Sequence, residues 1–293
     1  MTEPTSPDLV HEPVAASGPT WDTTSWPGGY VGVNPFPVGH KLMVHRWDRL
    51  TFLHWRYDPA VVQALLPPDL RVETFDGSAW VGLVPFLMEI RPGAGPALPW
   101  ISHFCETNVR TYVRGADGSV GVWFLSLDAA RLAAVVTARV GYRLPYFWSA
   151  MRLTESHRGG EHVVTYRSHR RWPGPRGATT KVSIRVGDAY SADELTELDH
   201  YLTARWRLFS PAGIGPVVTP TSERPGPVAP VGIRSGIADH GLWPLHRAEV
   251  VELHDELMEA GGLPAPVGPP IVHWSPGVEV DIGWPHRLPD TPA

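Results

Sequence analysis

The sequence predicts an α+β protein that consists mostly of strands. Runs rich in Val, Ile, Thr and aromatic residues recur along the chain and clearly outnumber the helix signals. Two Asp-Gly pairs, Asp76-Gly77 and Asp117-Gly118, stand between such runs and are strong signals for hairpin turns. Because closing a sheet removes its exposed edges, these strands are expected to form an antiparallel barrel or a curled sheet with a few peripheral helices.

The first helix signals come from N-cap residues. Asp58 followed by Pro59 predicts a helix through Leu66. Asp128 is expected to cap a second helix, which would run through Val140. The strands predicted around these helices are residues 50–57, 70–75, 79–90, 104–113, 121–127, 148–156, 162–169, 179–186 and 278–282.

Two further helix signals follow near the C-terminal half. Ser191 and Glu194 form a capping box ahead of a leucine stripe. The segment 246–260 begins ambiguously and is clearly helical only over 255–260. The whole chain divides into a Pro-rich, disordered arm (1–30), a single barrel-like domain (31–286) and a flexible tail (287–293).

Composition narrows the function classes. The 293 residues carry a net charge of −5, so there is no basic field to attract nucleic acid or an anionic membrane surface. The N-terminus does not resemble a signal peptide, and no apolar run is long enough to cross a bilayer. A soluble, cytoplasmic protein is therefore expected. Lys41 and Lys181 are the only lysines, so arginine supplies nearly all the positive charge.

No signature of a metal or cofactor site is present in the sequence. The single cysteine, Cys105, excludes an internal disulfide and a structural zinc site made of several thiolates. The 14 histidines are scattered and lack a recognised ligand spacing. There is no Walker loop, dinucleotide-binding glycine fingerprint or nucleophile elbow. The sequence thus predicts neither a metal nor a cofactor.

The predicted strand 104–113 carries the clearest candidate site. Residues two apart in a strand point the same way, so Glu106, Asn108, Arg110 and Tyr112 share one face. A carboxylate, an amide, a guanidinium and a phenol on one pocket wall could bind or transform a small molecule. The alternative is an ordinary half-exposed strand whose polar residues face solvent.

Several motifs in the same order make the chain resemble the YqjF-like family, known as domain of unknown function 2071. The resemblance covers most of the body, from Trp47 to Pro285. That family is similar in turn to the acetoacetate decarboxylases, which implies a β-barrel or cone with a central ligand pocket. The motifs are Phe52-Leu53-His54-Trp55, Leu65-Leu66-Pro67, Asp76-Gly77-Ser78-Ala79-Trp80-Val81, Glu106-Thr107-Asn108-Val109-Arg110-Thr111-Tyr112-Val113, Leu144-Pro145-Tyr146 and Ser275-Pro276-Gly277-Val278.

The decarboxylases form a Schiff base through a lysine amine that an adjacent lysine activates. In the similar segment of this chain, Tyr146 and Phe147 stand where that lysine pair would be. A phenol cannot form an imine, so the Schiff-base mechanism does not carry over. Lys181 is expected on a solvent-facing side of its strand, and Lys41 precedes the first strong strand.

The resemblance also implies two site residues. A pocket carboxylate of the decarboxylases matches Glu106, which supports an inward orientation for its strand. An arginine near the start of their first strand is similar to Arg49, although a shift of one residue would place Asp48 or Leu50 there. His240 lies in a further segment that resembles a family motif and is expected to help line the pocket or shape a turn.

These residues suggest roles that a structure can test. Glu106 is expected either to transfer protons or to form a structural ion pair with Arg110, since burial raises the pKa of a carboxyl group and a nearby guanidinium lowers it. Arg110 could instead anchor a substrate carboxylate, with Arg49, Asn108 and Tyr112 as further binding residues. Tyr146 could polarise a substrate oxygen or be a buried aromatic residue with a satisfied hydroxyl group.

Two functions are consistent with these residues. One is a cofactor-free acid–base enzyme, a lyase, isomerase or hydrolase, that acts on a small anionic or carbonyl-containing compound. The other is a non-catalytic ligand-binding barrel that serves as a sensor or carrier. A third, an interaction protein that uses the Pro-rich arm, rests on composition alone. The sequence leaves the substrate and the oligomeric state open.

Overall fold

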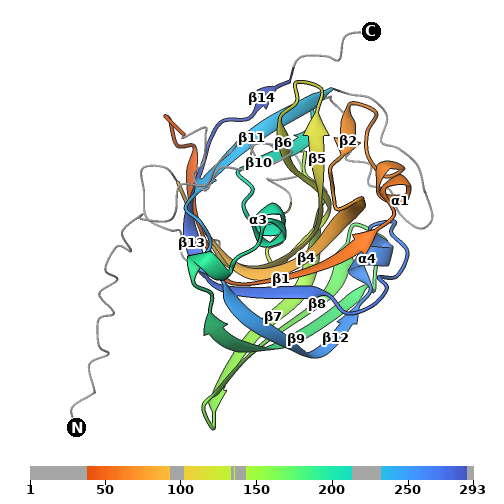
Figure 1. Ribbon diagram of the computed structural model, residues 1–293. Helices are drawn as coiled ribbons and strands as arrows, with labels where there is room; N and C mark the ends of the chain where they lie inside the picture. The colour runs from red at the N-terminus through yellow and green to blue at the C-terminus, as the bar shows by residue number, and fades with distance from the viewer. Residues whose placement is uncertain (1–37, 93–101, 133–134, 136–142, 213–231, 289–293) are drawn as a thin grey trace.

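The computed structural model describes residues 38–92, 102–132, 135, 143–212 and 232–288 (Figure 1). The predicted disordered arm and most of the predicted tail lie outside these ranges. Within them the chain is mostly strand, as expected. The strands are β1 (Met43–Tyr57), β2 (Leu70–Val72), β3 (Thr74–Phe75), β4 (Ser78–Pro92), β5 (His103–Gly115), β6 (Val120–Ala129), β7 (Tyr146–Arg158), β8 (Glu161–Trp172), β9 (Thr179–Ala189), β10 (Arg207–Pro211), β11 (Ile233–His240), β12 (His246–Asp255), β13 (Ile271–Ile282) and β14 (His286–Arg287).

Short helical segments connect the strands. The Asp58 carboxylate accepts a hydrogen bond from the Ala60 amide, which confirms the predicted N-cap. The capping box at Ser191 is present but opens only a 3₁₀ turn, and the following helix has a capping box of its own at Thr196 and Asp199. The helical segments are α1 (Pro59–Gln63), η2 (Ala192–Glu194), α3 (Glu197–Thr203) and α4 (Leu257–Ala260).

Two sequence predictions about helices are wrong or incomplete. Asp128 lies inside β6 and is not an N-cap, because its carboxylate is engaged by the buried Arg170 side chain. Most of the helix predicted after it lies outside the described residues. The ambiguous segment 246–260 is a strand, β12, as far as Asp255, and only Leu257–Ala260 is helical, so the predicted helix begins two residues later than expected. β10, β11 and β14 were not predicted.

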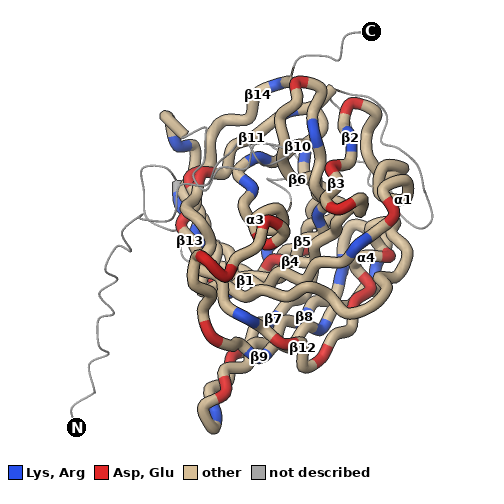
Figure 2. The backbone as a smooth tube through the Cα atoms, viewed as in Figure 1, with Lys and Arg blue, Asp and Glu red and all other residues tan. Residues whose placement is uncertain are grey.

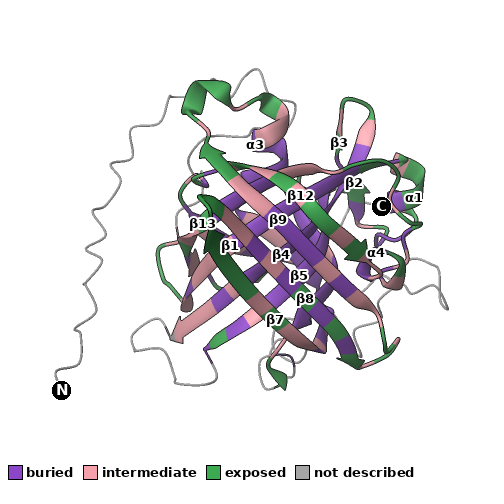
Figure 3. Ribbon diagram, turned by 90° about the horizontal axis from the view of Figure 1, so that it is seen from below, coloured by how far each residue is buried: buried purple, intermediate pink, exposed green. Residues whose placement is uncertain are grey.

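The strand pairings close into a ring. Successive pairings join β13, β1, β4, β5, β6, β10 and β11, and β11 pairs with β13 again. We call this the cavity ring. All of its pairings are antiparallel except the parallel contact between β10 and β6. α3 covers one end of the cavity ring, as the two perpendicular views show (Figure 1 and Figure 3).

A second closed set of pairings, the core ring, shares five of these strands. It leaves β6 through a parallel pairing with β7, continues through β8, β9 and β12, and returns to β13. Its interior is filled by a large apolar cluster that includes Leu53, Val81, Val109, Tyr166 and Ile184. Among the shared strands, β4, β5 and β6 are therefore buried along most of both faces, and Figure 3 shows β4 and β5 largely in purple.

A β-bulge in β1 sets which side chains face each ring. Five steps along β1, from Asp48 to Leu53, correspond to only four steps along β4. The extra residue is Arg49, whose φ of 51° lies in the left-handed region. Before the bulge, Trp47 faces the cavity; after it, Leu50 does. The bulge thus switches the inward-facing parity of the strand.

Gly277 on β13 makes room for this bulge. Its φ is 132°, and a Cβ atom at this position would lie 2.3 Å from the Trp47 carbonyl oxygen. Only glycine fits such a close approach of two backbones. The Ser275-Pro276-Gly277-Val278 motif therefore lies beside the bulge on the neighbouring strand and makes room for it.

Charged residues of both signs are interspersed along the chain (Figure 2). Several form cross-strand ion pairs on the outside, such as Arg185 with Glu249 on neighbouring strands. Among the described residues, no helix has the length and apolar character needed to cross a membrane.

Candidate functional site

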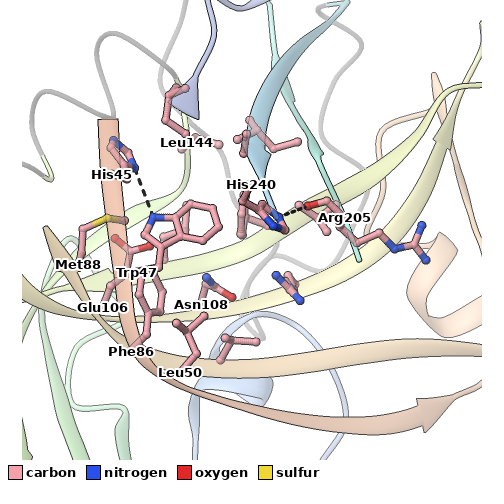
Figure 4. A pocket seen from close by; sticks show the side chains of 18 of the residues that line it. His45, Trp47, Leu50, Phe86, Met88, Glu106, Asn108, Leu144, Arg205 and His240 are labelled. Carbon is pink, nitrogen blue, oxygen red and sulfur yellow. Dashed lines mark hydrogen bonds between the residues drawn. The ribbon is translucent and has the colours of Figure 1, made fainter. Parts of the chain in front are cut away.

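A cavity of about 430 Å³ lies inside the cavity ring. Its walls are mainly apolar and aromatic, and its polar groups are few (Figure 4). This combination is typical of small-molecule sites, where a few fixed polar groups orient a largely apolar ligand. The apolar walls include Trp47, Leu50, Val84, Phe86, Met88, Phe104, Phe124, Leu127, Leu144 and Trp243.

Strand β5 supplies the polar row that the sequence predicts. Glu106, Asn108 and Arg110 all line the cavity, while Val109 and Val113 face the apolar core. The alternation holds because β5 pairs with β4 without a bulge, from Phe86 opposite Glu106 to Gly82 opposite Arg110.

Glu106 is the buried acid of the site. Its side chain is 2% exposed, and the Tyr146 hydroxyl donates a hydrogen bond to its Oε2 over 3.0 Å. Burial raises the pKa of Glu106 to about 8; the hydrogen bond from Tyr146 opposes this shift, and the charge of Asp128 adds to it. At neutral pH the carboxyl group is therefore mostly protonated.

Tyr146 comes to Glu106 from another strand. It is the first residue of β7, where a parallel pairing aligns it with Leu127 of β6. Burial and the neighbouring Glu106 raise the pKa of the Tyr146 phenol well above its usual value, so the phenol remains a hydrogen-bond donor. The sequence-predicted pair of catalytic residues is thus in direct contact.

Arg110 does not pair with Glu106. Its Nη2 donates to the Leu202 carbonyl oxygen of α3 over 3.2 Å, and its guanidinium carbon lies 5.4 Å from the Phe52 ring centre. No ion pair joins Arg110 to Glu106 among the described residues. The alternative of a structural Glu106–Arg110 ion pair is therefore wrong.

Two polar atoms of the β5 row have no hydrogen-bond partner among the described residues. They are the Nε of Arg110 and the Oδ1 of Asn108, whose side chains are both more than nine-tenths buried. Buried polar atoms are nearly always hydrogen-bonded, so each exception needs an explanation. Here both residues line the cavity, where a ligand's polar atoms could reach them.

His240 lies in the cavity wall. Its Nδ1 is 2.6 Å from the Gly241 carbonyl oxygen and its Nε2 is 3.0 Å from the Arg205 carbonyl oxygen. Its ring also lies 5.0 Å from the Trp243 ring. Burial lowers the pKa of His240. Both ring nitrogens are occupied by backbone contacts, so the structure favours a wall-forming role.

The other two predicted site residues lie elsewhere. Tyr112 continues the β5 face, but α3 covers it, and its hydroxyl lies 2.5 Å from the Leu202 carbonyl oxygen and 2.7 Å from His54 Nε2. Arg49 is turned outward by the bulge, where its Nε lies 2.5 Å from the Glu155 carboxylate. Neither lines the cavity.

Sequence reasoning missed His45. Trp47 Nε1 donates to His45 Nδ1 over 3.4 Å, so the neutral ring carries its hydrogen on Nε2 (Figure 4). Burial lowers the pKa of His45 to about 4, and its Nε2 has no partner among the described residues. The His-x-Trp spacing at the start of a strand was the available signal.

Two arginines were also missed, one in the connection between α3 and β10 and one at the start of β10. Arg205 and Arg207 line the cavity. Arg205 Nη1 lies 2.8 Å from the buried Glu73 carboxylate, and Arg207 Nη1 donates to Ser235 Oγ over 2.8 Å.

Both lysines lie outside the cavity. Lys41 pairs with Asp281 over 2.7 Å and is about half exposed. Lys181 pairs with Glu252 across the outer face of β9 and β12, so the expected solvent-facing position of Lys181 is confirmed.

One group of possible metal ligands has a sequence spacing that does not match a recognised metal-binding motif. Glu155, His157 and His162 lie on the β7–β8 hairpin with donor atoms within 4.8 Å of one another, because His157 pairs directly with His162 across the strands. The Glu155 carboxylate already bonds with Arg49 and His162. This pairing neutralises the charge that a cation would need.

A known protein family matches most of the chain. Residues 44–279 match DUF2071, a family described as an uncharacterized conserved protein. The chain belongs to the DUF2071 family. It is 30% identical over 252 residues to the uncharacterized protein YqjF of Bacillus subtilis, covering 86% of this chain and 94% of YqjF.

Solved structures similar to this DUF2071 protein share its fold. An acetoacetate decarboxylase-like enzyme from Sphingomonas wittichii has a TM-score of 0.55 at 18% identity, with 85% of this chain and 94% of that chain covered. The acetoacetate decarboxylase of Legionella pneumophila has a TM-score of 0.53 at 14% identity, with 87% and 92% covered. The enduracididine biosynthesis enzyme MppR complexed with pyruvate has a TM-score of 0.54 at 13% identity, with 94% and 100% covered. The expected decarboxylase-like fold is confirmed.

Proposed function

We propose that this DUF2071 protein is an enzyme that transfers protons on a small carbonyl or carboxylate compound, as a lyase, isomerase or hydrolase does. The observation that carries this proposal is Glu106. It is a buried carboxyl group that faces an apolar cavity, bonds with Tyr146 and has a pKa of about 8. A catalytic acid or base works best when its pKa lies near the operating pH.

The proton transfer follows from the two forms of Glu106. In its charged form Glu106 accepts a proton from the carbon next to the substrate carbonyl group, which leaves an enolate. In its neutral form it returns a proton to the enolate carbon or to a leaving group. Tyr146, which lines the same cavity, donates a hydrogen bond to the carbonyl oxygen or to Glu106 as the charge moves between them.

Substrate binding is assigned to the remaining polar row. Arg110 offers its unpartnered Nε–H to an anionic group, and Asn108 offers an acceptor oxygen to a hydroxyl or amine group. A charge-assisted hydrogen bond in a water-poor cavity is stronger than one at the surface. The ligand is therefore an organic anion with an apolar body.

The chemistry we propose requires no imine. It is supported by the outward positions of Lys41 and Lys181 and by Tyr146 and Phe147, which stand where the decarboxylases resembling this chain carry their lysines. The decarboxylase-like enzyme and MppR show that this fold hosts enzymes, and this is the reason for placing catalysis ahead of simple binding.

Hydrogen–deuterium exchange into a keto acid tests the proposal without knowledge of the final product. The protein is incubated in D₂O with 4-oxopentanoate or 7-oxooctanoate, and loss of the signal from protons beside the ketone is followed by proton NMR. Glu106→Gln should slow the exchange about 100-fold or more. The matched control is Glu155→Gln, which changes a carboxylate on the outside of the molecule and should leave the rate unchanged.

A non-catalytic carrier or sensor is the second candidate, and the outward position of both lysines favours it. In that case calorimetry would detect keto-acid binding, while the NMR signals would not change beyond the protein-free rate. Equal exchange in Glu106→Gln and in the unmodified protein would exclude Glu106 as the proton-transfer residue.

A further inference from the structure

The acid and the anion-binding group of the cavity stand apart on one strand. Glu106 and Arg110 lie four positions apart on β5, opposite Phe86 and Gly82 of β4. Because a strand rises about 3.3 Å per residue, their Cα atoms lie about 13 Å apart.

The Arg110 side chain does not close this distance. Its Nη2 bonds with the Leu202 carbonyl oxygen, and its guanidinium lies over the rings of Phe52 and Tyr112. Tyr112 follows Arg110 along β5, whereas Glu106 precedes it. The guanidinium therefore leans toward the α3 end of the cavity ring, away from Glu106. The carboxyl group of Glu106 is held in turn by Tyr146.

The part of the cavity between Glu106 and Arg110 is mainly apolar, unlike its two ends. Asn108 lies midway on β5, and the walls around it include Val84, Phe124 and Leu127. A ligand that reaches both ends must therefore pass an apolar stretch with one available acceptor oxygen, the Oδ1 of Asn108.

From this spacing we propose that the cavity is built for a medium-chain oxo acid. Its carboxylate binds Arg110, and its ketone oxygen lies at Glu106 and Tyr146, at the other end of the chain. With a hydrogen bond of about 2.9 Å at each end, a ligand spanning this separation must place its two polar groups about 7–8 Å apart. An extended chain advances about 1.25 Å along its axis per C–C bond, so a chain of seven or eight carbons, with six bonds between the carboxylate and ketone carbons, spans this distance. Short keto acids reach only one end at a time. This inference rests on the proposed function of the same cavity and adds the class and length of its substrate.

Isothermal titration calorimetry with three matched ligands tests this on the full chain. 7-Oxooctanoate has the required length, 4-oxopentanoate has the same end groups at a shorter distance, and octan-2-one is the same chain without the carboxylate. We expect 7-oxooctanoate to bind at least tenfold more tightly than either of the other two. If 4-oxopentanoate binds as tightly as 7-oxooctanoate, the proposed chain length is wrong. If octan-2-one binds as tightly, the proposed binding of the ligand carboxylate by Arg110 is wrong.

Two variants locate the ends of the ligand. Arg110→Gln should remove the preference for 7-oxooctanoate over octan-2-one, whereas Arg49→Gln, outside the cavity, should retain it. If Arg110→Gln does not fold, the three ligands still decide the matter on the unmodified protein. Glu106→Gln is expected to keep the length preference, because the amide still reaches the ketone. A length preference without any deuterium exchange would leave this inference standing while the proposed catalysis fails.

Discussion

The hydroxyl of Tyr146 and the carboxyl group of Glu106 meet over 3.0 Å inside the cavity, although 40 positions separate them in the sequence. The contact depends on the parallel pairing of β6 and β7, which brings the first residue of β7 beside β5. It makes the protonation of Glu106 sensitive to a single oxygen atom on another strand.

Removing that oxygen should raise the pKa of Glu106. The hydrogen bond from Tyr146 favours the charged carboxylate and so opposes the effect of burial. In Tyr146→Phe the pKa should move above about 8, and the pH profile of deuterium exchange should move upward with it. Carbon-13 NMR of glutamate carboxyl groups gives a direct measurement. Tyr190→Phe, outside the cavity, is the control and should leave the pH profile unchanged. An unchanged profile in Tyr146→Phe would contradict the role of the Tyr146 hydroxyl in lowering the pKa of Glu106.

Glu106 should also make folding stability depend on pH. An unperturbed glutamate has a pKa of 4.5, whereas Glu106 in the fold has a pKa of about 8, so the folded state binds the proton more tightly. The stabilisation is fully present below pH 4.5 and is lost as the pH rises toward 8, by up to about 1.4 kcal/mol per pH unit. In Glu106→Gln, the free energy of unfolding measured with urea should lack this dependence on pH. Between pH 5 and pH 8 the variant should therefore become more stable relative to the unmodified protein. Glu249→Gln, at an exposed position, should keep the slope of the unmodified protein.

The buried pair of Asp128 and Arg170 should be costly to break. Both side chains are fully buried, two hydrogen bonds of 2.5 and 3.0 Å join them, and the guanidinium lies 3.8 Å from the Phe147 ring centre. Asp128→Asn should destabilise the fold by about 3–5 kcal/mol, because it leaves a buried charge without its counterion. Loss of the surface partner in Glu249→Gln should cost about 1 kcal/mol or less. Chemical denaturation distinguishes the two, and similar losses would refute the assignment of Asp128.

Gly277 should tolerate no side chain. The Cβ of an alanine at this position would lie 2.3 Å from the Trp47 carbonyl oxygen, and the backbone would have to keep a φ of 132°. Gly277→Ala should therefore lower the free energy of unfolding by about 2 kcal/mol or more and weaken ligand binding, since Trp47 and Leu50 flank the bulge. Gly236→Ala is the matched control, because its Cβ would make only ordinary contacts at 3.6 Å. Equal thermal stability of both variants would show that the bulge does not depend on glycine.

Local patterns predicted much of this molecule. All nine predicted strands exist, and the alternation along β5 placed Glu106, Asn108 and Arg110 on the cavity face. These features depend on residues two apart in the chain, which the sequence displays directly. The Asp58 cap and the start of α1 are local in the same way.

The errors have long-range causes. Arg49 points outward because of a bulge that Gly277, more than two hundred residues later, makes possible. Tyr112 has the right parity but is covered by α3, whose position no local pattern contains. His45 and Arg205 belong to the cavity only because β11 closes the ring against β13.

Each strand shared by the two rings has one face toward the cavity and one face toward the packed core. On β4, Val84, Phe86 and Met88 face the cavity, whereas Val81 and Leu83 belong to the packed interior of the other ring. Side-chain volume can therefore be changed at alternate positions of one strand to admit a differently shaped ligand while the apolar packing behind it stays intact. This makes β4 a natural strand on which to re-engineer the specificity of the protein.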